Sequence, residues 1–343
     1  MTIKDKLLLI KNILSDKERK SILSILNDLK ELKKKNSFGE MKFYVLTLMY
    51  KKDAGNIHMY VNDSVLLRIF KLMTTQDNWF LLDNKIKFSE IMAGLPGITP
   101  LYLGKIEKGF IYDNKGKGFS IENKKDILPV IEKLVQIHKV IFIKSVEKFG
   151  GDGVFRCTET TTLNLDEINT DEDYIIEKGL TQHDSLNKIN PYCVNTLRVI
   201  SLNRNGEIKI PSCLLRMGVN ESYKDNASSG GIFVNYDIEK NKLGEIATKY
   251  LIKGGTSFYS HPESNFIFKN QSLPYPNEVI SIVTKATKMF PDRYIIGWDI
   301  AYTPEGPVII EGNTVPCVLQ MQISLRGLRN NKVYDGIYRE FYN

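Results

Sequence analysis

A chain of 343 residues, 42% hydrophobic and 25% charged, is long enough to bury a substantial core and has a globular composition. Its 47 Lys and Arg against 40 Asp and Glu give a net charge of +7, which fits an anionic ligand but also an ordinary lysine-rich surface. No basic stripe with interleaved aromatic residues occurs, which argues against nucleic acid as a partner. No apolar run approaches the roughly 18 residues of a transmembrane helix, and the N-terminus lacks a signal-peptide pattern. We therefore expect a cytoplasmic protein.

The first predicted elements are two helices between residues 3 and 35. Ser15-Asp16-Lys17-Glu18 matches a capping box and is predicted to separate them. We expect the apolar stripe of the second helix to dock on the protein's own domain. The alternative, suggested by flanking lysines, is a helix that binds a partner or a membrane surface. The stripe consists of Ile22, Leu23, Ile25, Leu26, Leu29 and Leu32.

Hydrophobic periodicity then predicts a mixture of helices and strands. The further predicted helices span 65–73, 84–92, 126–138 and 277–289. The predicted strands span 140–144, 174–177, 197–202, 208–215, 295–302 and 308–311. A helical N-terminal region followed by strands joined through turns indicates an α+β fold with antiparallel sheet.

The last two predicted strands form a hairpin that gathers oxygen ligands. Pro304-Glu305-Gly306 suits a three-residue connection, which puts Thr303 opposite Pro307. The same register puts Asp299 opposite Glu311, with side chains about 5 Å apart. Two neighbouring carboxylates repel unless a cation or a proton lies between them, so the hairpin predicts a site for a hard divalent ion such as Mg²⁺. The predicted ligands are Asp299, Glu311 and Asn313.

A lysine-flanked glycine-rich turn follows the first predicted strand. Lys144 ends that strand, and Lys148 directly precedes the turn. Glycines let backbone N–H groups approach phosphate oxygens, and lysine adds positive charge. A plain glycine-rich hairpin turn is the alternative. The glycines are Gly150, Gly151 and Gly153.

The strand predicted at 174–177 is apolar and ends in Glu177, and His183 and Asp184 follow it. Adenine needs backbone donors and acceptors on an apolar shelf, and the ribose hydroxyls need a carboxylate or an amide. This segment can supply both. A buried strand that ends in a polar turn is the alternative.

Two arginines belong to the next two predicted strands. Arg198 lies inside an apolar run and needs a partner, which is either a phosphate, a carboxylate or a structural ion pair. Arg216 ends the following strand. A polar, glycine-rich loop comes next, which either holds an anionic substrate or is a simple connection. Its candidate residues are Asn226, Ser229, Gly230 and Gly231.

In this order the residues resemble the nucleotide and metal ligands of the ATP-grasp superfamily. More narrowly, residues 80–325 resemble the sugar-transfer-associated ATP-grasp family. The motifs that carry this resemblance are Gln182-His183, Asn195-Thr196-Leu197-Arg198, Ser229-Gly230-Gly231, Gly297-Trp298-Asp299-Ile300 and Glu311-Gly312-Asn313. The resemblance implies an ATP-grasp fold, in which two α+β subdomains clasp ATP, after a helical N-terminal region. The implied segments are 1–78 (helical), 79–138 (N-terminal part of the module), 139–181 (lid with the glycine-rich loop) and 182–343 (C-terminal subdomain with the metal site).

The resemblance also implies a role for each candidate. The ATP phosphates would be contacted by Lys85 and by Lys144 or Lys148, under a lid of Gly150, Gly151 and Gly153. The nucleoside would meet Glu177 and Leu180 at the adenine and Asp184 or His183 at the ribose. Two Mg²⁺ ions would be bound by Asp299, Glu311 and Asn313. Arg198 would stabilise the transferred phosphoryl group and the tetrahedral intermediate. The substrate side would include Arg216, Asn226, Ser229, Gly230 and Gly231.

The implied activity is that of an ATP-dependent, ADP-forming carboxylate–amine ligase that forms an amide through an acyl phosphate. Its small-molecule carboxylate and amine would come from a sugar acid, an amino sugar or an amino acid in cell-surface polysaccharide (capsule) biosynthesis, with a nucleotide sugar or glycan as a further candidate partner. One alternative is an ATP-dependent kinase of a sugar or polyol. The other is a non-catalytic nucleotide-binding component of a glycan-assembly complex.

Overall fold

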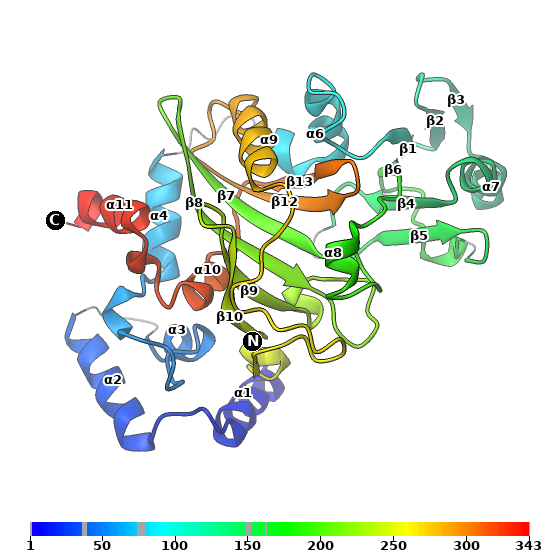
Figure 1. The fold of residues 1–343 in the computed structure, drawn as a ribbon. Coiled ribbons are helices and arrows are strands. Elements are labelled where there is room, and N and C mark those ends of the chain that lie inside the picture. Colours follow the sequence, from blue (N-terminus) through cyan, green and yellow to red (C-terminus); the bar gives the residue numbers. More distant parts are fainter. Residues whose placement is uncertain (1, 36–39, 74–79, 149–151, 162, 343) are drawn as a thin grey trace.

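The computed structural model describes residues 2–35, 40–73, 80–148, 152–161 and 163–342, which form two β-sheets with helices packed around them (Figure 1). Among the helices of these residues, none has both the length and the apolar character that crossing a membrane requires. The helices are α1 Ile3–Ser15, α2 Ile22–Lys35, α3 Glu40–Leu46, α4 Asp63–Met73, α5 Phe80–Asp83, α6 Lys85–Met92, α7 Ile127–His138, α8 Asp184–Asn187, α9 Pro276–Lys288, α10 Val318–Ser324 and α11 Lys332–Tyr342.

The described strands pair antiparallel throughout. The small sheet has the order β3-β2-β1-β6-β4-β5 and takes its strands from both of the predicted segments 79–138 and 139–181. Its strands are β1 Tyr102–Glu107, β2 Phe110–Asp113, β3 Gly118–Ser120, β4 Val140–Ser145, β5 Val154–Thr158 and β6 Tyr174–Lys178. The large sheet has the order β11-β10-β9-β8-β7-β12-β13. Its strands are β7 Thr196–Arg204, β8 Glu207–Met217, β9 Ile232–Asp237, β10 Lys242–Thr248, β11 Ser257–Phe258, β12 Ile295–Thr303 and β13 Gly306–Asn313.

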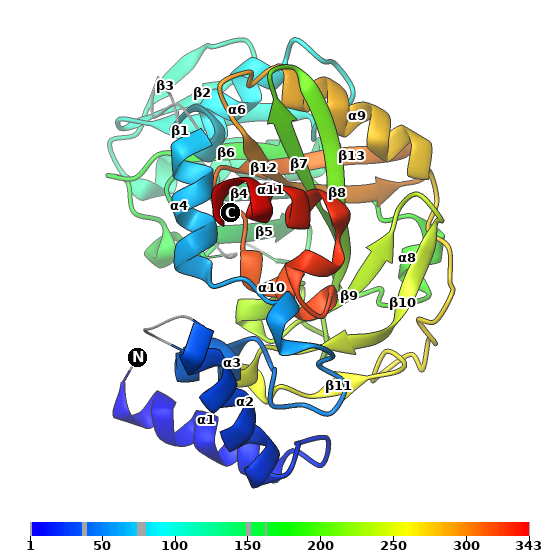
Figure 2. The ribbon, with the colours of Figure 1, turned by 90° about the vertical axis from the view of Figure 1, so that its left-hand side faces the viewer.

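The large sheet is buried on both faces, which explains why its central strands are almost continuously apolar. On one face, Phe88 and Met92 of α6 and Val283 of α9 pack with the sheet around Trp298. The other face is covered by α4, α10 and α11, which lie over the strands in Figure 2. The inner strands β7 and β12 are therefore buried along nearly their whole length.

The small sheet has a separate core, which it forms with α7. Ile127, Ile131 and Val135 of this helix pack on β4 and its neighbours. Helix α6 touches both units, because Ile86 packs against Val146 and Ile175 on the small-sheet side. Two units with separate cores thus meet along α6 and along the cavity described below.

The predicted α+β class and the antiparallel sheets are confirmed, and so is each predicted helix and strand after residue 60, within two or three residues at its ends. The elements that the sequence analysis did not predict are β1–β3, β5, β9–β11, α3, α5, α8, α10 and α11. Irregular pairing accounts for two of these omissions. In β1 a register shift precedes Gly104, whose φ is +156°, and in β10 the register shifts between Leu243 and Ala247.

The predicted capping box at residues 15–18 is wrong. Helix α1 ends at Ser15, and α2 begins only at Ile22, where the hydroxyl of Ser21 accepts from the N–H of Ser24 (3.2 Å). The segment between the helices pairs with residues 50–52 instead, for example through the N–H of Lys20 to the carbonyl of Tyr50 (2.8 Å). Arg19 and Lys51 form the bridge at the centre of this pairing, and the carbonyl of Glu18 accepts from the N–H of Lys52 (2.9 Å).

The stripe of α2 docks on the protein's own core only in part. Ile25, Leu29 and Leu32 pack against the core on the α4–α10–α11 side of the large sheet, as predicted. Ile22, Leu23 and Leu26 do not, and they stay exposed.

The hairpin of β12 and β13 has a tighter turn than predicted. Thr303 pairs with Gly306, so the prediction that it lies opposite Pro307 is wrong. A bulge between Asp299 and Ile300 then shifts the register by one residue, and Asp299 lies opposite Glu311 after all. The predicted carboxylate pair is therefore confirmed through two offsets that cancel.

Candidate functional site

A cavity of about 620 Å³ lies between the two sheets. Its floor and walls come from α6, from β4–β6 of the small sheet and from β7, β8, β12 and β13 of the large sheet. Among the residues that the structure describes, seven basic side chains line it against three acidic ones, so it favours a ligand with several negative charges. The basic residues are Lys85, Lys144, Lys148, Arg156, Lys178, Arg216 and Lys224, and the acidic ones are Asp225, Asp299 and Glu311.

The small-sheet wall of the cavity carries simple lysine–carboxylate pairs. Nζ of Lys144 on β4 lies 2.6 Å from Oε2 of Glu177 on the neighbouring strand β6, and both side chains are largely buried. Lys148 lies 2.9 Å from Glu172 and has a side chain that is 45% exposed. Both lysines line the cavity, so both alternatives for the phosphate contact stay open. The apolar side chains of Val140, Phe142, Val154 and Leu180 complete this wall.

Lys85 joins α6 to the loop after β4. Asn84 caps the helix through its side chain, so that Lys85 is the first helical residue. Its Nζ donates to the carbonyl of Lys148 at 2.8 Å. Burial lowers the pKa of Lys85, and the nearby carboxylate of Glu311 opposes this shift. A phosphate bound here would favour the charged form of the ammonium further.

The large-sheet wall is a buried charge network around Asp299. The register of β7 and β12 puts Arg198 directly beside Asp299, and its guanidinium donates to both carboxylate oxygens. Arg216, on β8, donates to Oδ2 of Asp299 (2.9 Å). The partner that Arg198 requires is thus a carboxylate. Burial opposes ionisation of Asp299, but the two arginines outweigh it and hold its pKa well below the usual value.

A second carboxylate fixes Arg216 from the other side. Asp225 lies 3.3 Å from its Nε. The hydroxyl of Thr196 accepts from Arg216 (2.7 Å from Nη2) and donates to Asp225. Although burial disfavours its charged form, Asp225 and Asp299 raise the pKa of Arg216. Every charge in this network therefore has a fixed partner, as burial requires.

Glu311 and Asn313 complete the predicted metal set. Glu311 faces Asp299 across the strands, and desolvation together with the charge of Asp299 raises the pKa of Glu311. The amide of Asn313 lies 3.4 Å from Oε1 of Glu311, so the two share a face. In the described part of the chain, no group of three or more His, Cys, Asp or Glu side chains is placed to hold a metal. The donor set is therefore two carboxylates and one amide oxygen, which suits Mg²⁺ better than a soft metal.

Two candidates for the ribose lie outside the cavity lining. His183 caps the short helix α8, with Nδ1 2.8 Å from the hydroxyl of Ser185, and its ring packs edge-on against Tyr275. Asp184 is exposed on the same helix. Within the adjacent segment, Leu180, Thr181 and Gln182 line the cavity instead.

The glycine-rich turn is described only in part. Gly150 and Gly151 lie outside the described residues. Gly153 has a φ of +65°, and its carbonyl accepts from the N–H of Ser145 (2.8 Å), which closes the turn between β4 and β5.

The predicted substrate loop touches the cavity at its first residue, Asn226. Ser229, Gly230 and Gly231 are not part of the lining. Gly230 has a φ of +102°, and a side chain at Gly231 would collide with the backbone of Asp225, so glycine is required there for packing.

Sequence reasoning missed several residues of the cavity. Arg156 and Lys178 belong to strands whose pairing was not predicted, and Lys224 and Asp225 directly precede the candidate loop. The adjacency of Asp225 to Asn226 was the available signal. Tyr192 and Tyr223 also line the cavity, and no sequence spacing marks them.

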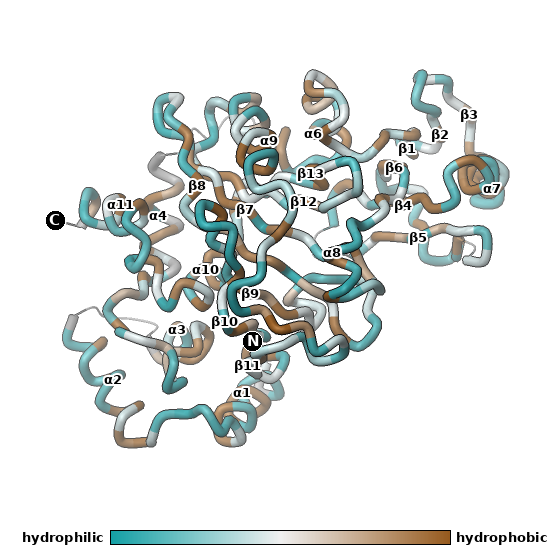
Figure 3. The backbone as a smooth tube through the Cα atoms, in the orientation of Figure 1, coloured by the Kyte–Doolittle hydropathy of each residue, from teal (hydrophilic) through white to brown (hydrophobic). Residues whose placement is uncertain are grey.

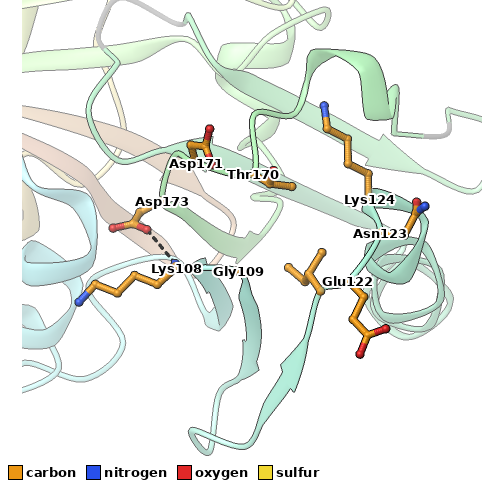
Figure 4. A pocket seen from close by; sticks show the side chains of 9 residues that line it. Lys108, Gly109, Glu122, Asn123, Lys124, Thr170, Asp171 and Asp173 are labelled. Carbon is orange, nitrogen blue, oxygen red and sulfur yellow. Dashed lines mark hydrogen bonds between the residues drawn. The ribbon is translucent and has the colours of Figure 1, made fainter.

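A second hollow of about 590 Å³ lies on the small-sheet unit (Figure 4). Two of its polar groups have protein partners: the N–H of Lys108 donates to Asp173 (3.3 Å), and Nζ of Lys124 donates to the carbonyl of Ile168 (2.6 Å). Fewer charged side chains line it than line the larger cavity, and they include both signs.

Comparison with solved structures finds proteins of low overall similarity. Similar solved structures include D-alanyl-alanine synthetase A from Vibrio cholerae (TM-score 0.44, 13% identity, 77% of this chain and 66% of that one). They also include N5-carboxyaminoimidazole synthase from Aspergillus clavatus (TM-score 0.44, 10% identity, 81% and 58%) and L-amino acid ligase from Bacillus licheniformis (TM-score 0.40, 10% identity, 75% and 48%). The chain thus spans less than two thirds of the length of each. No curated protein sequence matches it.

The two antiparallel α+β units of this chain, with a charged cavity between them, form the ATP-grasp fold that the matching family model names. The family model described as "Sugar-transfer associated ATP-grasp" matches residues 68–334, which is most of the chain. The chain belongs to the sugar-transfer associated ATP-grasp family.

Proposed function

We propose that this protein is an ATP- and Mg²⁺-dependent carboxylate–amine ligase that releases ADP and phosphate. One observation carries the proposal: the opposed carboxylates of Asp299 and Glu311 lie on the wall of a cavity that seven basic side chains line. Basic groups suit the phosphates of a nucleotide, and oxygen ligands beside them suit the metal that accompanies it.

The proposed roles follow from the two walls. Lys85 and Lys144 would bind phosphate oxygens, and Val140, Phe142 and Leu180 offer an apolar surface for the base. Asp299, Glu311 and the amide of Asn313 would hold Mg²⁺, two ions in our proposal. Bound Mg²⁺ would offset the charge of the phosphates. Arg198 and Arg216 keep Asp299 ionised and ready to act as a ligand.

The chemistry needs an activated carboxylate. A substrate carboxylate oxygen attacks the γ-phosphorus of ATP, ADP leaves, and an acyl phosphate forms. The amine nitrogen then attacks the carbonyl carbon, loses a proton, and expels phosphate to leave the amide. Arg216 lines the cavity next to the carboxylate pair, so it is our candidate for stabilising the negative charge that develops on the carbonyl oxygen.

The substrate class is the more specific part of the proposal. We propose a sugar acid, amino sugar or amino acid used in cell-surface polysaccharide biosynthesis in the cytoplasm. The family's description as sugar-transfer associated supports the glycan context. Near the substrate end, Lys224 and Asn226 would contact the acceptor together with the aromatic rings of Tyr192 and Tyr223.

The test measures product stoichiometry. Purified protein with ATP and Mg²⁺ is incubated with glucuronate or galacturonate, each combined with an amino acid or glucosamine, and nucleotides, phosphate and product mass are followed. The expected result is equimolar ADP and phosphate that depend on the amine, with a product that has lost one water. AMP and pyrophosphate would refute the acyl-phosphate route. ADP without free phosphate, together with a stable phosphoester, would establish the kinase alternative.

A further inference from the structure

The N-terminal helices α1 and α2 each dock on the protein through one stripe only. Leu9 and Ile13 of α1 and Ile25 and Leu29 of α2 pack against the core on the α4–α10–α11 side of the large sheet. The amide of Asn12 also donates to the carbonyl of Leu251 (2.8 Å). Both helices lie at the same end of the molecule in Figures 1 and 2, and they precede the residues that match the family.

The outward side of each helix is also apolar. On α1, Leu7, Ile10 and Leu14 follow the i, i+3, i+7 spacing of one face and are 62%, 54% and 61% exposed. Figure 3 shows α1 as a largely hydrophobic helix at the edge of the molecule. The start of α2 adds further exposed apolar side chains, and within the described residues no element covers either group. These are Ile22, Leu23 and Leu26.

The N-terminal region is strongly basic, and its exposed charges are mainly lysines. Residues 1–35 contain ten Lys and Arg and five Asp and Glu, a net +5 of the chain's +7. Three of the five acids pair with other residues of the protein: Asp28 with Lys20 (2.8 Å), Asp16 with Lys51 (3.1 Å) and Glu31 with His58 (2.7 Å). Lysines, by contrast, surround the apolar stripes and are exposed. They are Lys4, Lys6, Lys11, Lys30, Lys33 and Lys34.

We propose that α1 and α2 form a docking surface for an anionic lipid bilayer, on which the protein lies without crossing it. An exposed apolar stripe flanked by lysines can bury its side chains at the headgroup boundary while the ammonium groups meet lipid phosphates. A second copy of the chain is a poorer occupant, because a symmetric contact would bring two surfaces of net +5 together. The proposal does not depend on the ligase activity.

Vesicle flotation tests the docking surface. The full-length protein is mixed with vesicles of pure phosphatidylcholine or with about one third phosphatidylglycerol. We expect binding to the anionic vesicles at least tenfold stronger than to the neutral ones, and loss of that binding at high salt. Absence of binding to the anionic vesicles would overturn the proposal.

Two variants distinguish binding through this surface from non-specific binding through exposed apolar side chains. Leu7→Gln/Ile10→Gln/Leu14→Gln changes only exposed side chains and should reduce vesicle binding at least tenfold, with an unchanged circular dichroism spectrum. The matched control, Ile137→Gln/Ile267→Gln, changes apolar side chains that are equally exposed (61% and 62%) elsewhere and should bind like wild type.

An equal loss of vesicle binding in the triple variant and in the control would refute the assignment of the docking surface to α1 and α2. Light scattering without vesicles supplies the remaining readout. If the wild-type protein is a dimer and the triple variant is a monomer, a second copy of the chain is the occupant. That result would also overturn the proposal.

Discussion

The two walls of the cavity hold their charges differently. On the large-sheet wall, Arg198, Arg216, Asp225 and Asp299 are each less than 9% exposed and form one continuous network. On the small-sheet wall Lys144 and Lys148 each pair with one carboxylate, and Lys148 is nearly half exposed. A buried network loses much when one member is removed, whereas an exposed pair loses little. Changes on the large-sheet wall should therefore affect chemistry or folding, and changes on the small-sheet wall should affect nucleotide affinity.

The largest expected effect is on catalysis at the large-sheet wall. Glu311→Gln keeps the shape of the side chain but removes a ligand charge, so Mg²⁺-dependent ATP turnover should fall at least about 100-fold, which corresponds to nearly 3 kcal/mol. The matched control is Glu305→Gln at the exposed hairpin turn, which should keep wild-type turnover.

The same variant separates a metal role from a structural one. Because Asp299 and burial raise the pKa of Glu311, the charge of Glu311 disfavours the metal-free fold. Urea unfolding without Mg²⁺ should therefore show Glu311→Gln to be as stable as wild type or more stable. A variant that loses both stability and turnover would indicate a structural glutamate.

The next effect is on stability. Asp299→Asn leaves Arg198 buried without a charged partner and should lower the free energy of unfolding at pH 7 by about 3 kcal/mol. The control Asp237→Asn breaks a surface pair with Lys240, which is 78% exposed, and should cost under about 1 kcal/mol. If urea unfolding shows the same loss of unfolding free energy for Asp299→Asn and Asp237→Asn, the contrast between buried and exposed ion pairs is wrong.

The pH dependence of that loss has a definite sign. The pKa of Asp299 is lower in the folded than in the unfolded protein, so its stabilisation is complete above the unfolded value of 3.8. It is lost as the pH falls through the folded pKa. The stability difference between wild type and Asp299→Asn should thus stay constant from pH 5 to pH 8, which urea midpoints at several pH values would show.

The smallest effects are expected on the small-sheet wall. Lys144→Met removes a largely buried ammonium group that lines the cavity and should raise the KM for ATP by about tenfold, with a smaller change in kcat. Lys148→Met should raise KM only about two- to threefold, because its side chain is half in solvent. The control is Lys139→Met, an exposed lysine paired with Glu159. A larger effect at Lys148 would assign the phosphate contact to it.

Elements with strong periodicity were predictable from the sequence. Strands β7 and β12 are apolar along their length because both faces of the large sheet are covered, and α7 and α9 have regular apolar stripes. β1 and β10 were not predictable, because a glycine or a register shift interrupts their alternation.

The metal side of the site was more predictable than the rest. Asp299 and Glu311 were paired correctly by local hairpin geometry, although the turn and the bulge were not foreseen. The link between Arg216 and Asp225 depends on how the loop after β8 turns back toward that strand, which the periodicity of the strand does not encode. His183 matched a motif, yet its ring caps α8, a role that only the turn geometry reveals.

The most direct test of the account is a calorimetric titration of the protein with ADP, with and without Mg²⁺. If one nucleotide lies between the walls, Mg²⁺ should strengthen ADP binding in wild type and should not do so in Glu311→Gln. Lys144→Met should weaken binding in both conditions. Equal ADP affinity with and without Mg²⁺ in wild type, or no binding at all, would contradict a nucleotide–metal site formed by the two walls.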